Sequence, residues 1–196
     1  MALDDRKLHS LARLGLALAA ILAVAAASGG LAGTAQAGTA CGQYGGKSAT
    51  ELRAGQARAA VRCLVNRKRN RHGVRDVGRN RPLQRAAQSH TEVMRRKLCF
   101  SHLCPGEGTL EVRLRVAGYI VSGLSSWAAG ENIAWASGRY SSPRSTVNRW
   151  MQSPGHRANI LSARFRDLGV GFVRGAPQRG VTGAGMYTTD FGRRAR

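Results

Sequence analysis

The sequence predicts an α+β domain in which helices come first and strands come last. Apolar residues recur at helical spacing as far as residue 161, and the pattern then changes to the alternation of strands in residues 168–173 and 186–191. A chain of 196 residues also has the length of one domain with its own hydrophobic core.

Residues 1–37 have the organisation of a secretory signal peptide. Three basic residues precede an apolar run over 14–27, and the small-residue sequence Ala-Gln-Ala ends at Ala37. The run is shorter than the roughly 20 residues that cross a bilayer. We therefore expect cleavage after Ala37, secretion, and no transmembrane segment in the mature chain. A retained N-terminal membrane anchor is the alternative.

The chain is strongly basic, with a formal net charge of +21. All but four of its 31 basic residues are arginine, whose planar guanidinium pairs well with phosphate and carboxylate groups. An exported protein rarely meets nucleic acid, so lipid headgroups and anionic polymers of the cell envelope are the expected partners. A general arginine bias with no specific partner is the alternative.

Four cysteines agree with an oxidising compartment. We expect Cys99 to pair with Cys104, because the two are close in sequence, which leaves Cys41 to pair with Cys63. A zinc site is the rival interpretation, but the sequence has neither a C-x-x-C pair nor the Cys/His spacing of a zinc finger.

The first predicted helix covers residues 49–71 and follows a Gly-rich N-terminal extension, residues 38–48. A capping box from Ser48 to Glu51 opens the helix. Its end begins a basic run, Arg67 to Arg85, which predicts either an anion-binding patch or a solvated helix end and loop. Cations are common near a helix C-terminus, which favours the second interpretation.

A second helix opens at Pro82 and ends near Leu98. It places His90 on an apolar stripe, so we expect a core histidine rather than a ligand. His102 follows in the loop between the two close cysteines, where a disulfide would fix its position. Such an imidazole suits ligand binding or proton transfer, and a simple surface role is an equal alternative.

A third, short helix is predicted over 110–117, between Thr109 as its cap and Gly118. Farther along, Glu131 stands between a glycine and an apolar stretch, which predicts a half-buried side chain. A half-buried carboxylate must be paired, hydrogen-bonded or protonated.

A fourth helix begins after the cap Ser142 and ends at Gln152. The sequence Ser153-Pro-Gly stops it and is expected to place His156 at a turn. A short apolar segment, residues 158–161, follows at once.

The two predicted strands are joined by a Gly-rich hairpin loop. Gly169 and Gly171 leave room on the first strand for a closely packed element. Residues 194–196 are expected to form a basic tail.

The candidate site consists of His102, Glu131 and His156. Their wide separation in sequence means that only the tertiary fold could gather them. Two imidazoles and a carboxylate suit a divalent metal or acid–base chemistry. Neither H-E-x-x-H nor G-x-S-x-G occurs, so a zinc peptidase or serine hydrolase has no local support.

Six spaced motifs occur in order along the chain. They are Phe100-Ser-His102, Ala117-Gly-Tyr119, Gly130-Glu-Asn-Ile-Ala134, Trp150-Met-Gln-Ser-Pro-Gly-His156-Arg-Ala-Asn-Ile-Leu161, Gly169-Val-Gly171 and Tyr187-Thr-Thr-Asp-Phe-Gly192. Together they resemble the CAP superfamily of cysteine-rich secretory, antigen 5 and pathogenesis-related proteins, in its compact bacterial, SCP-like form.

This resemblance implies a three-layer α-β-α sandwich with a small antiparallel sheet, formed by residues 49–193. It also implies a cleft lined by two histidines and two acids, of which His102, Glu131 and His156 match three. Ser153 stands where eukaryotic members often carry the second acid. Asp190 could compensate only if its side chain faced the cleft.

The expected cleft comprises His102, Glu131, His156, Ser153 and Asn132. Without the second acid, we expect at most a weak divalent cation site, for zinc, made by the two histidines and the glutamate, and no required cofactor.

The resemblance favours a secreted, monomeric, non-enzymatic module that binds a lipid, a cell-wall component or a protein. The first alternative is a metal-assisted hydrolase or peptidase with Glu131 as base and His102 and His156 as ligands or acids. The second is a basic, envelope-associated structural protein.

Overall fold

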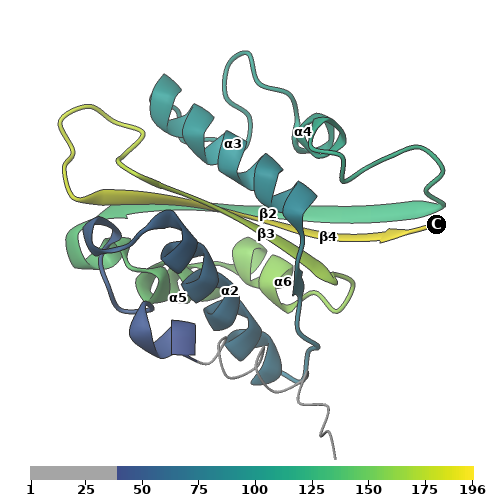
Figure 1. Cartoon of the computed structure of the whole chain (residues 1–196), viewed down its shortest axis with the longest axis horizontal. Helices are drawn as coiled ribbons and strands as arrows, with labels where there is room; N and C mark the ends of the chain where they lie inside the picture. The colour runs from purple at the N-terminus through teal and green to yellow at the C-terminus, as the bar shows by residue number, and fades with distance from the viewer. Residues whose placement is uncertain (1–38) are drawn as a thin grey trace, which may run out of the picture.

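A four-stranded sheet separates two layers of helices (Figure 1). The computed structural model describes residues 39–196, and the predicted signal peptide with its cleavage site lies outside them. The helices are η1 (Ala49–Glu51), α2 (Ala54–Asn70), α3 (Arg81–Lys97), α4 (Leu110–Val116), η2 (Gly138–Ser141), α5 (Pro143–Gln152) and α6 (Pro154–Leu161). The strands are β1 (Gly78–Arg79), β2 (Ser126–Ser137), β3 (Asp167–Arg174) and β4 (Ala184–Ala195).

The strand order is β1-β3-β4-β2, so β2 forms one edge of the sheet. Helices α2, α5 and α6 cover one face, and α3 and α4 cover the other (Figure 1). This arrangement confirms the predicted α-β-α sandwich. The sheet is mixed rather than purely antiparallel, because the short β1 pairs parallel to β3.

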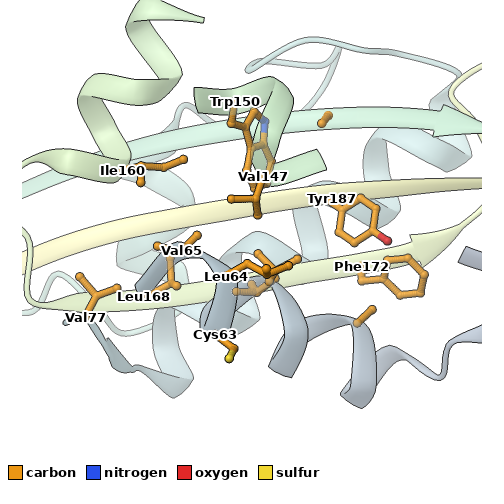
Figure 2. Packing of buried hydrophobic residues seen from close by; sticks show 14 of the residues in the cluster. Cys63, Leu64, Val65, Val77, Val147, Trp150, Ile160, Leu168, Phe172 and Tyr187 are labelled. Carbon is orange, nitrogen blue, oxygen red and sulfur yellow. The ribbon is translucent and has the colours of Figure 1, made fainter. Parts of the chain in front are cut away.

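The larger core lies between the sheet and the α2, α5 and α6 layer (Figure 2). Trp150 and Val147 from α5 contribute to it together with Ile160 from α6, and all three are buried. Tyr187 and Phe172 meet them from β4 and β3, with ring centroids 4.9 Å apart. Each large apolar side chain buried in this way contributes roughly 1.5–3 kcal/mol of transfer free energy.

The other face of the sheet approaches α3 very closely. A Cβ atom added at Gly169 would lie 2.1 Å from the carbonyl carbon of Leu83, and one at Gly171 would lie 2.3 Å from the carbonyl oxygen of Ala87. Real Cβ atoms do not come so close to backbone. The prediction that another element packs closely against Gly169 and Gly171 is therefore confirmed, and that element is α3.

Three side chains from α5 and α6 donate to backbone carbonyl groups of the edge strand β2. Asn159 Nδ2 lies 3.1 Å from the oxygen of Glu131, and Trp150 Nε1 lies 3.0 Å from that of Ile133. Arg149 Nη1 lies 3.3 Å from the oxygen of Trp135.

The predicted first helix is divided in two. The Glu51 carboxylate accepts the backbone N–H of Ser48 at 2.8 Å, so the predicted capping box is present, but it opens only the single turn of η1. Leu52 then adopts an extended conformation and is fully buried. Burial of this side chain interrupts the helix, and α2 starts afresh at Ala54.

Strand β2 was not predicted, because its sequence mixes small, polar and apolar residues without alternation. The predicted N-terminal extension is partly helical, over 39–43, and the predicted basic tail is not a tail. Instead β4 continues to Ala195, where it pairs with the start of β2.

Both predicted disulfides are present. The Cys41–Cys63 bond joins the helical turn at 39–43 to α2, and the Cys99–Cys104 bond closes the loop after α3. Across residues 39–196, none of the helices combines the length and the apolarity needed to cross a membrane.

Candidate functional site

The candidate site forms where the two helical layers meet at the outer edge of β2. His102 comes from the disulfide loop, and its Nδ1 lies 2.8 Å from Glu131 Oε1 on β2. The His102 side chain is 56% exposed, whereas that of Glu131 is 3% exposed. The fold therefore gathers these two predicted residues, and it buries Glu131 more deeply than the sequence indicates.

Arg113 of α4 is the principal counterion of Glu131. Its Nη2 lies 3.0 Å from Oε2 and 3.1 Å from Oε1 of the carboxylate, and it also donates to the backbone oxygen of His102 at 3.2 Å. Burial raises the pKa of Glu131, but the hydrogen bond from His102 and the charge of Arg113 outweigh burial and leave this pKa below its usual value. Glu131 is therefore ionised at neutral pH.

His90 lies beneath this pair, on the sheet-facing side of α3. It is fully buried, and its Nδ1 lies 2.8 Å from Glu107 Oε2 in the loop before α4. Its Nε2 lies 3.8 Å from Glu131 Oε1. Burial lowers the pKa of His90 despite the nearby carboxylates, so the ring is neutral at pH 7. The predicted core histidine is confirmed, and it belongs to a buried polar network.

Asp190 is the deepest acid of this network. It pairs in register with Glu131 across β2 and β4, and it is only 1% exposed. Burial raises the pKa of Asp190 well above its ordinary value, and the charge of Glu131 adds to this rise. Asp190 is therefore a neutral acid inside the protein and does not replace the missing acid of the cleft.

His156 lies in the first turn of α6, not at a turn between helices as predicted. Pro154 suits the first position of a helix, so α6 begins directly after α5 with only Ser153 between them. Burial lowers the pKa of His156, and the charge of His102 lowers it further. The two imidazoles therefore influence each other, although within residues 39–196 no hydrogen bond joins them.

Asn132 and Ser153 have different roles from those of cleft ligands. Asn132 is fully buried, and its Nδ2 donates to the backbone oxygen of His156 at 3.1 Å. Its Oδ1 accepts from Asn159 Nδ2 at 2.9 Å. Asn132 thus holds α6 against β2, whereas the Ser153 side chain is partly exposed and makes no capping hydrogen bond.

Comparison with known proteins agrees with this geometry. The family model described as "CAP: Cysteine-rich secretory protein family" matches residues 63–189. The chain belongs to the CAP family. The matched segment includes His102, Glu131 and His156 and ends one residue before Asp190.

Relatives of this CAP domain occur in Bacillus subtilis. The chain is 33% identical over 110 residues to the protein YkwD and 33% identical over 111 residues to the membrane protein YlbC. These matches cover 56% and 57% of this chain, but only 40% of YkwD and 30% of YlbC. The chain thus spans less than half the length of either relative.

Solved structures share the fold. An extracellular protein of Bacillus anthracis that contains an SCP domain matches with a TM-score of 0.58 and 30% identity, over 70% of this chain and 40% of that one. A cysteine-rich secretory protein of Staphylococcus aureus matches with a TM-score of 0.52 and 16% identity, over 71% of this chain and 39% of that one. The second likeness concerns the fold alone.

The donors around Glu131 bear on whether this site of the CAP domain could hold a divalent metal. Among residues 39–196, no three His, Cys, Asp or Glu side chains are grouped to hold a metal ion. Both oxygens of Glu131 already face donors, His102 Nδ1 at 2.8 Å from Oε1 and Arg113 Nη2 at 3.0 Å from Oε2. Arg113 is a cation, and its guanidinium would repel a metal ion beside it.

Sequence reasoning missed Arg113, Glu107 and Asn159. A signal for Arg113 exists, because it follows Leu110 by three residues and so falls on the apolar stripe that Leu110, Leu114 and the C-cap Ala117 form along α4. An arginine on such a stripe needs a buried acid. Glu107 and Asn159 carry no comparable signal, because the tertiary fold alone brings them to the site.

Proposed function

We propose that this protein is an exported, monomeric CAP domain that binds an anionic component of the cell envelope, a lipid or a wall polymer, without catalysing a reaction. One observation carries the non-enzymatic part. Glu131, the group that a hydrolase would use as its base, is buried and paired with both His102 and Arg113. The predicted signal peptide, the two disulfides and the extracellular relative in Bacillus anthracis support export.

The basic run from Arg67 to Arg85 supports an anionic ligand. Within this run, Arg69 is fully buried and donates to the backbone oxygens of Ile160, Ser162 and Phe165, so it is structural. Arg67, Arg71 and Arg75 are exposed, and among the described residues their side chains have no hydrogen bond or ion pair. These three cations, which we call the α2-end patch, remain available to phosphate or carboxylate groups.

Co-sedimentation with isolated bacterial cell walls and with anionic vesicles tests this proposal. We expect the triple change of Arg67, Arg71 and Arg75 to Gln to reduce the bound fraction several-fold, and added salt to weaken binding of the unchanged protein. The matched control changes Arg164, Arg179 and Arg196 to Gln, which removes the same charge from scattered exposed positions. Equal loss in both variants would contradict a defined patch and favour the basic structural protein.

The hydrolase alternative is favoured by one contact, the 2.8 Å hydrogen bond between the exposed His102 and Glu131. A carboxylate that orients an imidazole is a common feature of general bases. We expect Glu131→Gln to lower the melting temperature, and neither protein to cleave peptides. Peptide turnover by the unchanged protein that disappears in Glu131→Gln at equal stability would overturn the binding proposal.

Chelation tests the proposed lack of a required metal. Because Arg113 pairs with the only acid of the predicted cleft, we expect millimolar EDTA to leave the melting temperature unchanged within one degree. Addition of zinc after EDTA provides the control. A fall of several degrees that zinc reverses would show a bound structural ion.

A further inference from the structure

A cavity lies between α3, α4 and the loop that joins them, and it shares Arg113 and Glu107 with the polar network around Glu131. Its volume is about 440 Å³, which is within the range of small-molecule sites. None of His102, Glu131 and His156 lines it. Its charged lining consists of Arg85, Arg96, Lys97, Arg113 and Glu107.

The lining carries an excess of positive charge. Its one acid, Glu107, already has partners: its Oε2 lies 2.8 Å from His90 Nδ1, and its Oε1 lies 3.7 Å from the cationic Arg113 Nη1. Arg85 and Lys97 donate to the backbone oxygens of Ala117 and Pro105, which position their side chains without neutralising them. Within residues 39–196, neither these two residues nor Arg96 has an acidic partner.

Arg113 adds a buried positive charge to this lining. Its side chain is only 7% exposed, and within residues 39–196 its Nε and Nη1 atoms are closed to solvent and have no hydrogen-bond acceptor. A buried charge is screened less than an exposed one, so Arg113 favours an anionic ligand over a neutral one.

Most of the remaining lining is apolar and partly open to solvent. Ala86 and Val93 contribute from α3, and Val112 and Val116 contribute from α4. Val112 is 47% exposed and Val116 is 86% exposed. An exposed apolar wall beside a cationic floor fits a ligand that has both an anionic head and a short apolar body.

We propose that this cavity binds a phosphate group carried on a short apolar body, either a soluble phosphomonoester or the headgroup end of an anionic lipid. Phosphate suits the site better than carboxylate because it brings more negative charge and more acceptor oxygens to several cations. The inference does not rest on the proposed envelope-binding function, since the α2-end patch lies in the opposite helical layer.

Isothermal titration with hexyl phosphate tests the proposal, with hexanol and inorganic phosphate as the two half-ligands. We expect hexyl phosphate to bind more tightly than either. Arg96→Gln should weaken it about tenfold, because Arg96 makes no internal hydrogen bond and its loss leaves the fold intact. Arg95→Gln is the matched control: it removes the same charge from the next residue of α3, which does not line the cavity.

A variant that fills the cavity distinguishes binding in the cavity from non-specific attraction of an anion to a basic protein. Ser89 is exposed and lines the cavity, so Ser89→Trp should obstruct it without changing the charge. We expect this variant to lose hexyl phosphate binding. Unchanged binding in Ser89→Trp, or equal weakening in Arg95→Gln and Arg96→Gln, would overturn the proposal.

Vesicles of phosphatidylcholine with or without phosphatidic acid identify the source of the phosphate. Binding to phosphatidic acid that Ser89→Trp abolishes would support the site and assign it to a lipid headgroup. Hexyl phosphate binding that Ser89→Trp abolishes, without any effect of Ser89→Trp on vesicle binding, would support the site and assign it to a soluble phosphomonoester.

Discussion

At the scale of single residues, Glu131 depends on the groups around it. An ionised carboxylate in a protein interior is stable only when charges and donors replace its water. Arg113 supplies the charge and His102 supplies a hydrogen bond, while a protonated Asp190 avoids a second negative charge on the neighbouring strand. Each of these groups therefore affects stability through Glu131.

The substitution Arg113→Met tests whether the stability of the fold depends on the counterion of Glu131. We expect a loss of about 3–5 kcal/mol in the free energy of unfolding, because Glu131 is left buried without its counterion. The control is Arg115→Met, which removes an exposed ion pair with Glu111 and should cost less than about 1 kcal/mol. Urea denaturation measures both values. A loss in Arg113→Met no larger than that of the control would contradict the assigned role of Arg113.

Asp190→Asn should alter how stability depends on pH. The raised pKa means that native Asp190 keeps a proton that the unfolded chain releases near its ordinary pKa of 3.8, so this residue lowers the free energy of unfolding as pH rises above about 4. Asparagine has no proton to release. We therefore expect the melting temperature of Asp190→Asn, relative to the unchanged protein, to increase from pH 4 to pH 8.

Glu131 and His90 act in the opposite direction. Each has a lowered pKa in the folded protein, so each stabilises the fold less as pH falls. Both residues are present in the protein and in the variant, so their effects largely cancel in the comparison. A difference in melting temperature that does not change between pH 4 and pH 8 would contradict a protonated Asp190.

At the scale of elements, local signals predicted the helices better than the strands. Thr109 accepts the Val112 N–H and Ser142 accepts the Ser145 N–H, and the helices that follow begin where these caps predict. A helix cap can be recognised from residues that are close together in sequence. Strand β2 could not be found in this way, because it exists through its pairing with β4, whose partner residues lie 47 to 69 positions away in sequence.

The contact of β3 with α3 gives a test at this scale. Gly171→Ala places a methyl group against the Ala87 carbonyl and Thr91, so we expect a loss of roughly 1–3 kcal/mol in stability. Gly55→Ala is the matched control, because Gly55 lies inside α2 with open space around its Cβ position. Alanine is the better helix former there and should stabilise by up to about 1 kcal/mol. Similar effects of the two substitutions on thermal melting would show that α3 packs less closely.

At the scale of the whole molecule, the sequence predicted three residues of the site but not the buried polar groups beneath them. His102, Glu131 and His156 lie within motifs that resemble those of a family. His90 and Arg113 reach Glu131, and Glu107 reaches His90 and Arg113, only because α3 and α4 pack on the same face of the sheet. Side-chain burial of this kind follows from how the layers pack on each other, and the spacing of residues along the sequence carries no information about that packing.

The two disulfides should contribute unequally to the stability of the molecule. On the chain-entropy model, the Cys41–Cys63 bond, with a sequence separation of 22, contributes roughly 3 kcal/mol, and the shorter Cys99–Cys104 bond roughly 2 kcal/mol. We expect the double Ala variant of the first pair to melt at a lower temperature than that of the second. The second variant should instead change the NMR chemical shifts of His102, because it opens the loop that carries this residue. The reverse order of melting temperatures would contradict the entropic account.

The side chains that contact the outer carbonyl groups of β2 have a consequence for association. An unpaired edge strand normally offers backbone acceptors to a strand of another molecule. Here Asn159, Trp150 and Arg149 occupy the acceptors of every second residue from Glu131 to Trp135. A neighbouring copy therefore finds no continuous ladder to extend, so this long strand can lie at the margin of its sheet without seeding fibrils.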